Sequence, residues 1–166
     1  MKRTVFFIIS VIFLFSSCAL EIANVIGPGG GYVFYDKGNY DGGWRYIECS
    51  SFDFGEIKDV TPANIQKALD LCEEHSGGWY RFGWELPEEA DLKKMLECFS
   101  YGLTKFSSDY YYISANPKEG YDSENPSPDK LDPIVLHKNF DNKLNGEVEQ
   151  VKDYTGVIRI RPIRRF

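Results

Sequence analysis

The chain has 166 residues and a formal net charge of −6 at pH 7, with 27% charged and 43% hydrophobic residues. An acidic chain repels the phosphate backbone, so nucleic acid is not expected as a partner. Aromatic residues make up 16% of the chain, which is enough for a packed core and excludes a wholly disordered protein.

The first eighteen residues have the pattern of a secretory signal. Lys2 and Arg3 form a basic start, and an apolar run follows over residues 5–15. This run is too short to span a bilayer, because a spanning helix needs about twenty apolar residues. The segment 14–18, Leu-Phe-Ser-Ser-Cys, resembles the lipobox of bacterial lipoproteins, in which the cysteine is acylated and becomes the mature N-terminus.

This resemblance implies a lipid, including palmitate, on Cys18. Residues 1–17 would be the lipoprotein signal peptide and residues 18–26 a lipidated tether. Several acyl chains anchor a protein stably, since each buried methylene contributes about 0.8 kcal/mol. We therefore expect an exported protein that is anchored to the bacterial envelope, at the outer membrane or cell surface, with a periplasm-facing orientation left open.

The rest of the chain, residues 27–166, is expected to form one domain, and a chain of about 150 residues buries about two thirds of its unfolded surface. Removal of Lys2 and Arg3 with the signal leaves 17 basic and 25 acidic residues and a formal charge of −8. The spacer between the lipid and the first glycine run, residues 19–26, reaches less than roughly 30 Å. The domain is therefore expected close to its membrane.

The domain is predicted to begin with a β-hairpin. A glycine-rich segment, 27–31, leads into the aromatic and β-branched run 32–35, which is typical of a strand. Turn-forming residues fill 36–43, and 44–49 again has strand character, as expected for a hairpin. A phosphate-binding glycine loop would instead open a helix and carry Gly-Lys-Ser/Thr, so the glycine-rich segment does not indicate a phosphate site.

Two amphipathic helices are predicted next. Thr61 and Pro62 are a favourable N-cap and first residue, and this helix ends near the glycines at 77–78. A second helix starts at 87–89, where acidic side chains suit the helix dipole. Each helix has a core-facing apolar stripe at helical spacing. The stripes are Ile65, Ala68, Leu69 and Cys72 in the first helix, and Leu92, Met95, Leu96 and Phe99 in the second.

The second half of the chain is predicted to return to strands, at 110–113, 134–136 and 156–161. Between the first two lies a loop, 116–133, that is rich in Pro, Asp, Ser and Glu. Loops of this length in compact domains are usually functional or mobile. The order of strands, then helices, then strands is typical of an α+β fold with a largely antiparallel sheet.

Three cysteines remain in the domain, at Cys49, Cys72 and Cys98. In an exported protein an odd count allows one disulfide and one thiol, or no disulfide. Their spacing is not that of zinc ligands. The loop 36–43 lacks the order of acidic residues of an EF-hand, although weak calcium binding there stays open. We predict no metal site and no cofactor.

Three segments carry a family resemblance. Residues 29–38 with 43–48 resemble the opening hairpin of the Lcl C-terminal domain family, named after a bacterial collagen-like adhesin. Residues 84–92 resemble its Trp-x-Leu-Pro helix start, and residues 160–166 its closing segment. Similar Trp-x-Leu-Pro segments occur in relatives of the formylglycine-generating enzyme, which have a C-type-lectin-like fold. The resemblance implies a compact C-type-lectin-like α+β domain over 27–166.

Ligand binding is predicted on the tyrosine-rich loop face, through Tyr111, Tyr112 and Tyr121. Tyrosine combines apolar area with a hydroxyl at low entropic cost, although buried packing is expected for at least one of the adjacent pair. The basic residues at the end of the chain are Arg159, Arg161, Arg164 and Arg165. Arg159 and Arg161 are candidate contacts for an anionic ligand, because alternation along a strand points both to one face. Ion pairing with the chain's own acidic side chains is the preferred alternative.

These observations favour a non-catalytic domain that binds a host or envelope protein or a glycan, and the resemblance to an adhesin's terminal domain supports this expectation. Catalysis is not predicted. Formylglycine-generating chemistry needs a cysteine pair in the C-terminal part, and no cysteine follows Cys98. The two histidines, His75 and His137, lack a supporting catalytic motif. A structural envelope component without an external ligand is the alternative.

Overall fold

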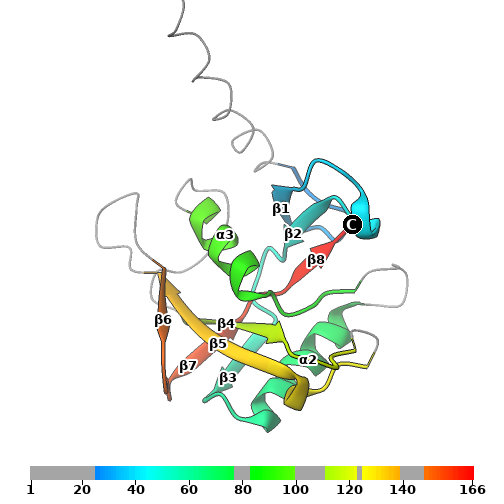
Figure 1. Cartoon of the computed structure of the whole chain (residues 1–166). Coiled ribbons are helices and arrows are strands. Elements are labelled where there is room, and N and C mark those ends of the chain that lie inside the picture. The colour runs from blue at the N-terminus through cyan, green and yellow to red at the C-terminus, as the bar shows by residue number, and fades with distance from the viewer. Residues whose placement is uncertain (1–24, 77–82, 100–110, 123–124, 139–147) are drawn as a thin grey trace, which may run out of the picture.

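The computed structural model describes residues 25–76, 83–99, 111–122, 125–138 and 148–166, which form a mixed α+β fold (Figure 1). The strands are β1 (Tyr32–Asp36), β2 (Tyr46–Cys49), β3 (Gly55–Lys58), β4 (Tyr111–Pro117), β5 (Leu131–Lys138), β6 (Val148–Val151), β7 (Val157–Ile160) and β8 (Ile163–Arg165). The helices are α2 (Pro62–Ser76) and α3 (Glu89–Phe99), with short 3-10 turns η1 (Asp41–Gly43) and η2 (Pro128–Lys130). Cys18 and the predicted signal peptide lie outside these residues.

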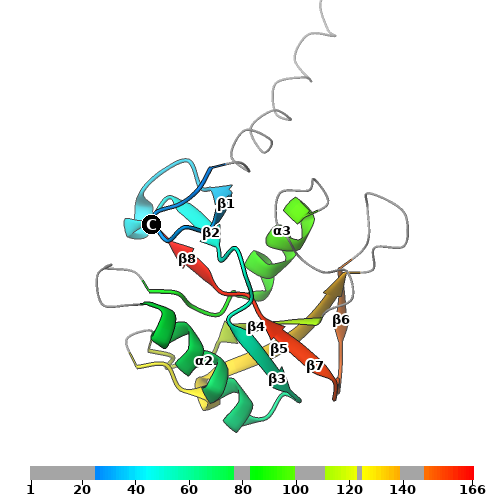
Figure 2. The ribbon, with the colours of Figure 1, turned by 180° about the vertical axis from the view of Figure 1, so that it is seen from behind.

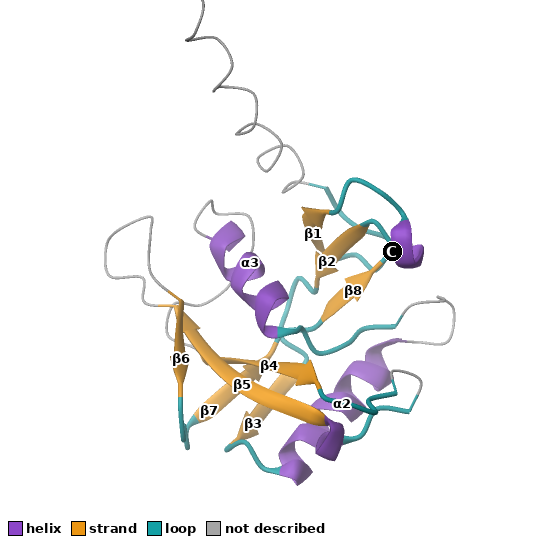
Figure 3. Cartoon of the chain, in the orientation of Figure 1, coloured by secondary structure: helices purple, strands orange, loops and turns teal. Residues whose placement is uncertain are grey.

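The strands form two sheets (Figure 3). The small sheet has the order β1-β2-β8, and the large sheet has the order β3-β7-β4-β5-β6. Within the described ranges each strand pairing is antiparallel except that of β4 with β7. The predicted hairpin is confirmed as β1 paired with β2, and the mainly antiparallel character is confirmed as well. The consecutive strands β7 and β8 belong to different sheets, so the chain crosses from one sheet to the other after Ile160.

The two helices pack on opposite faces of the large sheet (Figures 1 and 2). The stripe of α2 joins a core cluster with Ile113 and Ala115 of β4, whereas the stripe of α3 joins a second cluster with Tyr112, between the two sheets. Alternation along β4 explains this division, because neighbouring strand residues point to opposite faces. Both predicted helix stripes are buried as expected, apart from Phe99, whose side chain lies outside the description.

The helix starts are fixed in two different ways. At α2, the backbone N–H of Asn64 donates to Thr61 Oγ1 at 3.3 Å, which confirms the predicted N-cap. At α3, the N–H of Glu89 donates to Asn116 Oδ1 of β4 at 2.9 Å, so a residue far along the chain caps this helix. The N–H of Ala115 also donates to the carbonyl of Pro87 at 2.9 Å. These bonds hold the beginning of α3 against the large sheet.

The predicted loop 116–133 is shorter in the structure, which corrects the sequence prediction. β4 continues to Pro117 and pairs with β5 from Leu131 onward, so the connection shrinks to 118–130 and includes η2. The prolines in this segment favoured the prediction of a loop. Pro133 is tolerated because the described pairing of β5 with β6 starts only at Val135, so no partner on that side needs its missing N–H.

The glycine-rich segment encloses a buried carboxylate. The N–H groups of Gly29 and Gly31 donate to the two oxygens of Glu48 at 2.8 and 3.0 Å. A Cβ on Gly31 would lie 2.2 Å from the carbonyl oxygen of Cys49, and one on Gly27 would lie 2.4 Å from Glu48 Oε2. The glycines therefore allow the backbone to approach β2 closely, and the donors that an external anion would need are occupied by the chain's own side chain.

Candidate ligand-binding pocket

A pocket of about 260 Å³ lies between α2, the segment that precedes α3, and the connection from β4 to β5. Its apolar wall includes Leu69, Leu86, Ala115 and Leu131, its aromatic residues are Trp84 and Tyr121, and its charged residues are Glu73, Glu85, Glu88 and Arg165. An apolar wall with a few convergent polar groups is the usual composition of a ligand site. The volume is small, so it suits one side chain or one small group of a larger ligand.

A backbone bridge positions the charged side of the pocket. Glu85 and Ile163 exchange two N–H to carbonyl hydrogen bonds, each of 2.9 Å, as an isolated antiparallel bridge. This bridge holds the segment before α3 alongside β8. Arg165, two residues after Ile163 on the same strand, therefore reaches the side chains around Glu85.

Arg165 is held by several carboxylates. Its Nη1 forms an ion pair with Glu85, its Nη2 donates to Asp91 Oδ2 at 2.5 Å, and Glu88 Oε1 lies 3.8 Å from Nη2. The side chain of Arg165 is 19% exposed, whereas Glu85 is 43% and Glu88 48% exposed. The cation thus lies beneath Glu85 and Glu88, which are the more exposed side chains. We call Glu85 and Glu88 the acidic rim.

Two residues of the pocket have raised pKa values, chiefly because they are buried. Burial among protein atoms raises the pKa of Glu85, and the Arg165 charge and hydrogen bond oppose this increase, while Asp91 and Glu88 add to it. The pKa of Tyr121 is also raised, first by burial and next by the charge of Glu85. Both shifts follow from placing several carboxylates in a partly dehydrated space.

Tyr121 is placed by the β4–β5 connection. The N–H of Tyr121 donates to the carbonyl of Lys118 at 3.1 Å, and the N–H of Lys118 donates to the carbonyl of Lys130 at 2.9 Å. Gly120 has φ +76°, a left-handed conformation that favours glycine at this turn. These features direct the half-buried Tyr121 ring against the core cluster beside α2 and into the pocket wall.

Trp84 connects the pocket to an aromatic surface. Its backbone N–H donates to Ser76 Oγ, at the end of α2, at 2.8 Å. The ring meets Phe54 edge to face at a centroid distance of 5.6 Å, and Phe54 stacks on His75 at 4.0 Å. Phe52 next to them is an exposed aromatic residue. Aromatic faces thus continue outward from the pocket along the end of α2.

Of the tyrosines predicted to bind ligand, only Tyr121 lines the pocket. Tyr112 is 1% exposed in the core between α3 and the large sheet, so the structure corrects its proposed surface role and agrees with burial of one of the adjacent pair. Tyr111 lies on the opposite sheet face, stacked on Tyr154 at 3.9 Å and His137 at 4.5 Å. Cys18, the predicted lipid-attachment residue, lies outside the described residues.

The two candidate arginines contact acidic side chains of the same chain. Arg159 forms an ion pair with Glu56 of the neighbouring strand β3. Arg161 is buried, with Nε 2.6 Å from Asp53 Oδ1 and Nη1 donating to the carbonyl of Ser50 at 3.0 Å. Arg161 is thereby removed from the surface, because it follows the end of β7 in the crossing between the sheets. Both arginines therefore form ion pairs with acidic side chains of the same chain, which was the preferred alternative.

Sequence reasoning missed the charged part of the pocket. Residues 84–92 stood out in the sequence only for their family resemblance, and Arg165 only as one of four basic residues at the end of the chain. The sequence offered one signal for this acidic group: Glu85 follows a tryptophan and Glu88 follows a proline, directly before a helix. Their approach to Arg165 depends on the bridge to β8, which no local pattern shows.

The thiols of the core are poor nucleophiles. The structure has Cys49, Cys72 and Cys98 as thiols, and burial raises the pKa of Cys49 and of Cys72 to about 12. Such thiols stay protonated near neutral pH, whereas nucleophilic attack needs the thiolate. No disulfide joins Cys49, Cys72 and Cys98 in the structure.

The acidic turn 36–43 is organised by internal contacts. The guanidinium of Arg45 binds both oxygens of Asp36 at 2.7 and 2.8 Å and holds the pKa of that carboxyl below its usual value. Asn39 Oδ1 accepts the N–H of Asp41 at 3.0 Å. Over the whole described part of the chain, no group of three or more His, Cys, Asp or Glu side chains is arranged to hold a metal ion.

None of the helices within the described ranges has the length and apolar character needed to cross a membrane. Comparisons with known proteins give no match, since no family model, no curated protein and no solved structure matches this chain.

Proposed function

We propose that this chain is a lipid-anchored envelope protein whose domain binds, without catalysis, a cationic group of a partner protein at the pocket. Attachment through Cys18 and the lectin-like character of the domain are parts of this proposal, and both are implied by the sequence resemblances. The observation that supports the binding function best is the acidic rim, Glu85 and Glu88, beside Tyr121. A lysine or arginine side chain of the partner would enter there.

Charge and exposure favour a cation over an anion. The pocket lining contains three glutamates, Glu73 among them, against one arginine. Arg165 is already held by Glu85 and Asp91 and is less exposed than Glu85 and Glu88, so an incoming anion would meet the carboxylates of the acidic rim first. In a partly dehydrated cleft lined by one sign of charge, the local potential attracts the opposite sign.

The aromatic residues add a second attraction for the same group. A cation over the face of Tyr or Trp gains about 0.5–1 kcal/mol at exposed sites. Tyr121 and Trp84 both line the pocket. The methylene stem of lysine or arginine would pack on the apolar wall at Leu69 and Leu131 while its charged end meets the acidic rim.

Catalysis receives no support from the lining residues. The pocket has one thiol, Cys72, whose raised pKa keeps it protonated. No histidine lines the pocket within the described ranges. Nucleophilic catalysis needs an activated nucleophile with an adjacent base, and this combination is missing from the pocket.

Titration calorimetry with the purified full-length chain tests the function. A lysine- and arginine-rich peptide is expected to bind, and an acidic peptide of equal length is not. Binding should weaken at high salt, because screening shortens the reach of charges. Glu85→Gln and Glu88→Gln should each weaken binding by about two- to fivefold, the range for exposed ion pairs.

Glu74→Gln is the matched control, since Glu74 is an exposed residue of α2 that does not line the pocket. It should leave the affinity unchanged. Equal binding by the parent and both rim variants would contradict the pocket assignment. Binding of neutral glycans in place of the basic peptide would favour a glycan, and not a cationic protein group, as the ligand. Absence of any ligand would favour a structural envelope component.

A further inference from the structure

We propose that the pocket is one of two subsites for a partner peptide, and that the second subsite is an aromatic shelf that takes an aromatic side chain of the same peptide. The shelf consists of the exposed rings of Phe52 and His75, which rest on the buried ring of Phe54. This inference rests on the proposed function, and it adds a second recognised residue at a limited distance from the cationic group.

Ring contacts join the shelf to the pocket. The Phe52 centroid lies 5.4 Å from that of Phe54 and 6.3 Å from that of His75, and Phe54 stacks on His75. Phe54 also meets Trp84 edge to face, and Trp84 lines the pocket together with Ser76, the residue after His75. A chain of aromatic contacts thus runs from the shelf to the pocket wall.

Phe52 presents an exposed ring on a fixed backbone. Its side chain is 56% exposed, whereas the other phenylalanines that the structure describes are buried or half-buried. The N–H of Phe52 donates to Ser50 Oγ at 3.2 Å, and the same hydroxyl donates to the carbonyl of Phe52 at 2.7 Å. The next residue, Asp53, is held by Arg161. A ligand that stacks on a ring held in this way loses little affinity to ordering of the protein.

The charge beside the shelf favours a peptide as the occupant. Glu73 lies two residues before His75 on α2 and lines the pocket, as do Glu85 and Glu88 of the acidic rim. A polypeptide supplies a lysine or arginine for these carboxylates and an aromatic side chain for the shelf within one chain. Aromatic residues and arginine are enriched in protein interfaces. A neutral or anionic sugar would place no cation at the acidic rim.

The ring distances limit the spacing of the two recognised residues. The Phe52 centroid is 5.4 Å from that of Phe54, which is 5.6 Å from that of Trp84, so Phe52 and Trp84 are at most 11.0 Å apart. Side chains point the same way two residues apart in a strand and three apart in a polyproline II helix, at about 7 and 9 Å. The peptide thus carries its aromatic residue two or three positions from the lysine or arginine.

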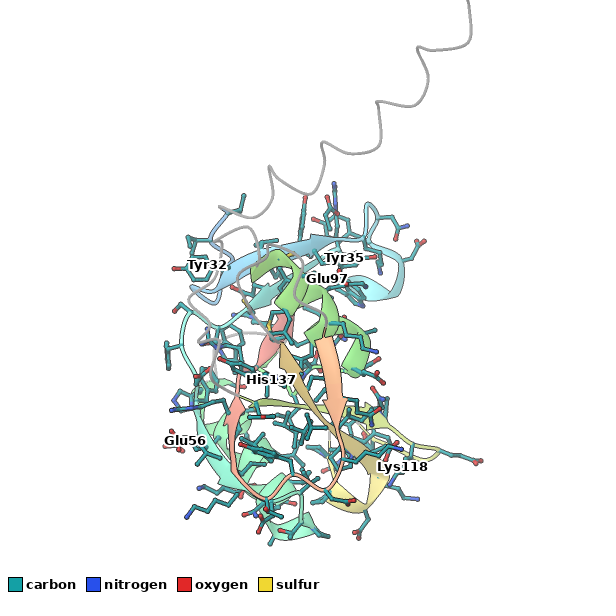
Figure 4. All side chains as sticks on the ribbon, turned by 90° about the vertical axis from the view of Figure 1, so that its left-hand side faces the viewer. Tyr32, Tyr35, Glu56, Glu97, Lys118 and His137 are labelled. Carbon is teal, nitrogen blue, oxygen red and sulfur yellow. The ribbon has the colours of Figure 1, made fainter. Side chains whose placement is uncertain are left out.

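The stacked rings of Tyr111 and His137 are separate from this site. These two residues pair at one end of the β4–β5 ladder, whereas Pro117 and Leu131, which line the pocket, pair at the other end. Figure 4 shows the same separation, with His137 apart from Lys118, the first residue of the β4–β5 connection. A ligand in the pocket therefore reaches the shelf and not this second stack.

Two basic peptides that differ in one residue test the inference. The lysine- and arginine-rich peptide of the functional test is made with phenylalanine or with alanine two residues from its central lysine, and each is titrated into the full-length chain by calorimetry. The phenylalanine peptide should bind about three- to tenfold tighter, as expected for one aromatic pair. Phe52→Ala should remove this difference and leave the affinity for the alanine peptide unchanged.

Tyr40→Ala is the matched control. Tyr40 is 62% exposed, does not line the pocket, and has no ring contact with the shelf within the described ranges, so this variant should keep the full difference between the peptides. Phe52→Leu keeps apolar bulk against Phe54 and is used if Phe52→Ala fails to fold. It should also reduce the difference, because leucine offers no aromatic face.

Loss of the difference in the Phe52 variants, but not in Tyr40→Ala, supports the shelf. Equal binding of both peptides by the parent chain overturns the shelf and leaves the proposed function standing. A difference that persists in the Phe52 variants places the aromatic residue elsewhere and also overturns it. Binding of neither peptide overturns the proposed function and the shelf with it. Binding of neutral oligosaccharides that Phe52→Ala abolishes assigns the shelf to sugar rings and overturns the peptide as its occupant.

Discussion

Glu48 and Arg164 face each other across β2 and β8 in the interior of the protein, with Glu48 Oε1 3.8 Å from Arg164 Nε. Both side chains are buried. The carboxylate is further held by the N–H groups of Gly29 and Gly31. Burying charges is costly unless they are paired and hydrogen-bonded, so this pair and the glycine-rich segment depend on each other.

Replacement of Glu48 should therefore destabilise the fold. Glu48→Gln keeps one acceptor oxygen and puts an amide NH₂ in place of the other, so one of the N–H groups of Gly29 and Gly31 loses its acceptor, which costs about 1–3 kcal/mol. The midpoint of urea unfolding should fall accordingly. Glu56→Gln is the matched control, because Glu56 is an exposed member of the Arg159 pair and its loss should cost less than about 1 kcal/mol. Similar losses in both variants would contradict the importance of burial.

The pH dependence of stability provides a second prediction. Burial raises the pKa of Glu48 above its ordinary value of 4.5, although Gly29, Gly31 and Arg164 oppose the increase. The folded state then holds its proton more tightly than the unfolded state. Stability from this group is present below the unfolded pKa and is lost as pH rises through the folded pKa.

Mild acidification from pH 7 toward pH 5 should thus increase the contribution of Glu48, and that of Glu85, whose pKa is also raised. Melting temperatures across this range check the sign. The double variant Glu48→Gln with Glu85→Gln should lose this part of the pH response. A parent chain whose stability falls steadily over the same range, with the same slope as the variant, would contradict the shifts.

Trp84 should contribute strongly to stability. Its ring packs against the first core cluster and lies close to the backbone of Gly29 and Gly31, where an added Cβ would come within 2.8 and 3.0 Å of it. Trp84→Ala is expected to cost about 3 kcal/mol, the lower end for large aromatic truncations, because the ring is only partly buried. Thermal melting followed by circular dichroism measures the loss. An unchanged melting curve would show that the ring serves the pocket alone.

Membrane attachment is expected to require Cys18. In Cys18→Ser the protein should leave the membrane fraction or accumulate as an unprocessed precursor, since the proposed acyl chains would be its strong attachment. Cell fractionation with detergent partitioning measures the change. Cys98→Ser should behave as the parent chain in this assay. Normal signal removal and unchanged partitioning of Cys18→Ser would contradict the lipid anchor.

The sequence predicted the elements whose signals are local. The α2 helix shows this best, because Thr61 and Pro62 mark its start and the spacing from Ile65 to Cys72 its buried face. The strands β3, β6 and β8 were not predicted, since each has three or four residues and gains its stability from a partner distant in the sequence. β8, for example, pairs with β2 of the first hairpin.

The candidate site was predicted only through Tyr121. Tyr112 and Arg161 have surface-like residue types, but their burial is determined by the α3 packing and by the crossing from β7 to β8. The acidic rim depends on Glu85 meeting β8, and the capping of α3 depends on Asn116. Contacts between segments of such separation leave no periodic pattern in the sequence, so they become visible only in the folded chain.

The crossing of the chain from β7 to β8 has a mechanical consequence. The residues 157–165 contribute one strand to each sheet, and the buried Arg161 fixes the short span between them to Asp53. The connection from β2 to β3 crosses at the same place, since Ser50 accepts from Arg161. The two crossings are hydrogen-bonded to each other, so we expect that opening one sheet disturbs the other. Amide protons of both sheets are therefore expected to exchange through one shared opening of the whole domain.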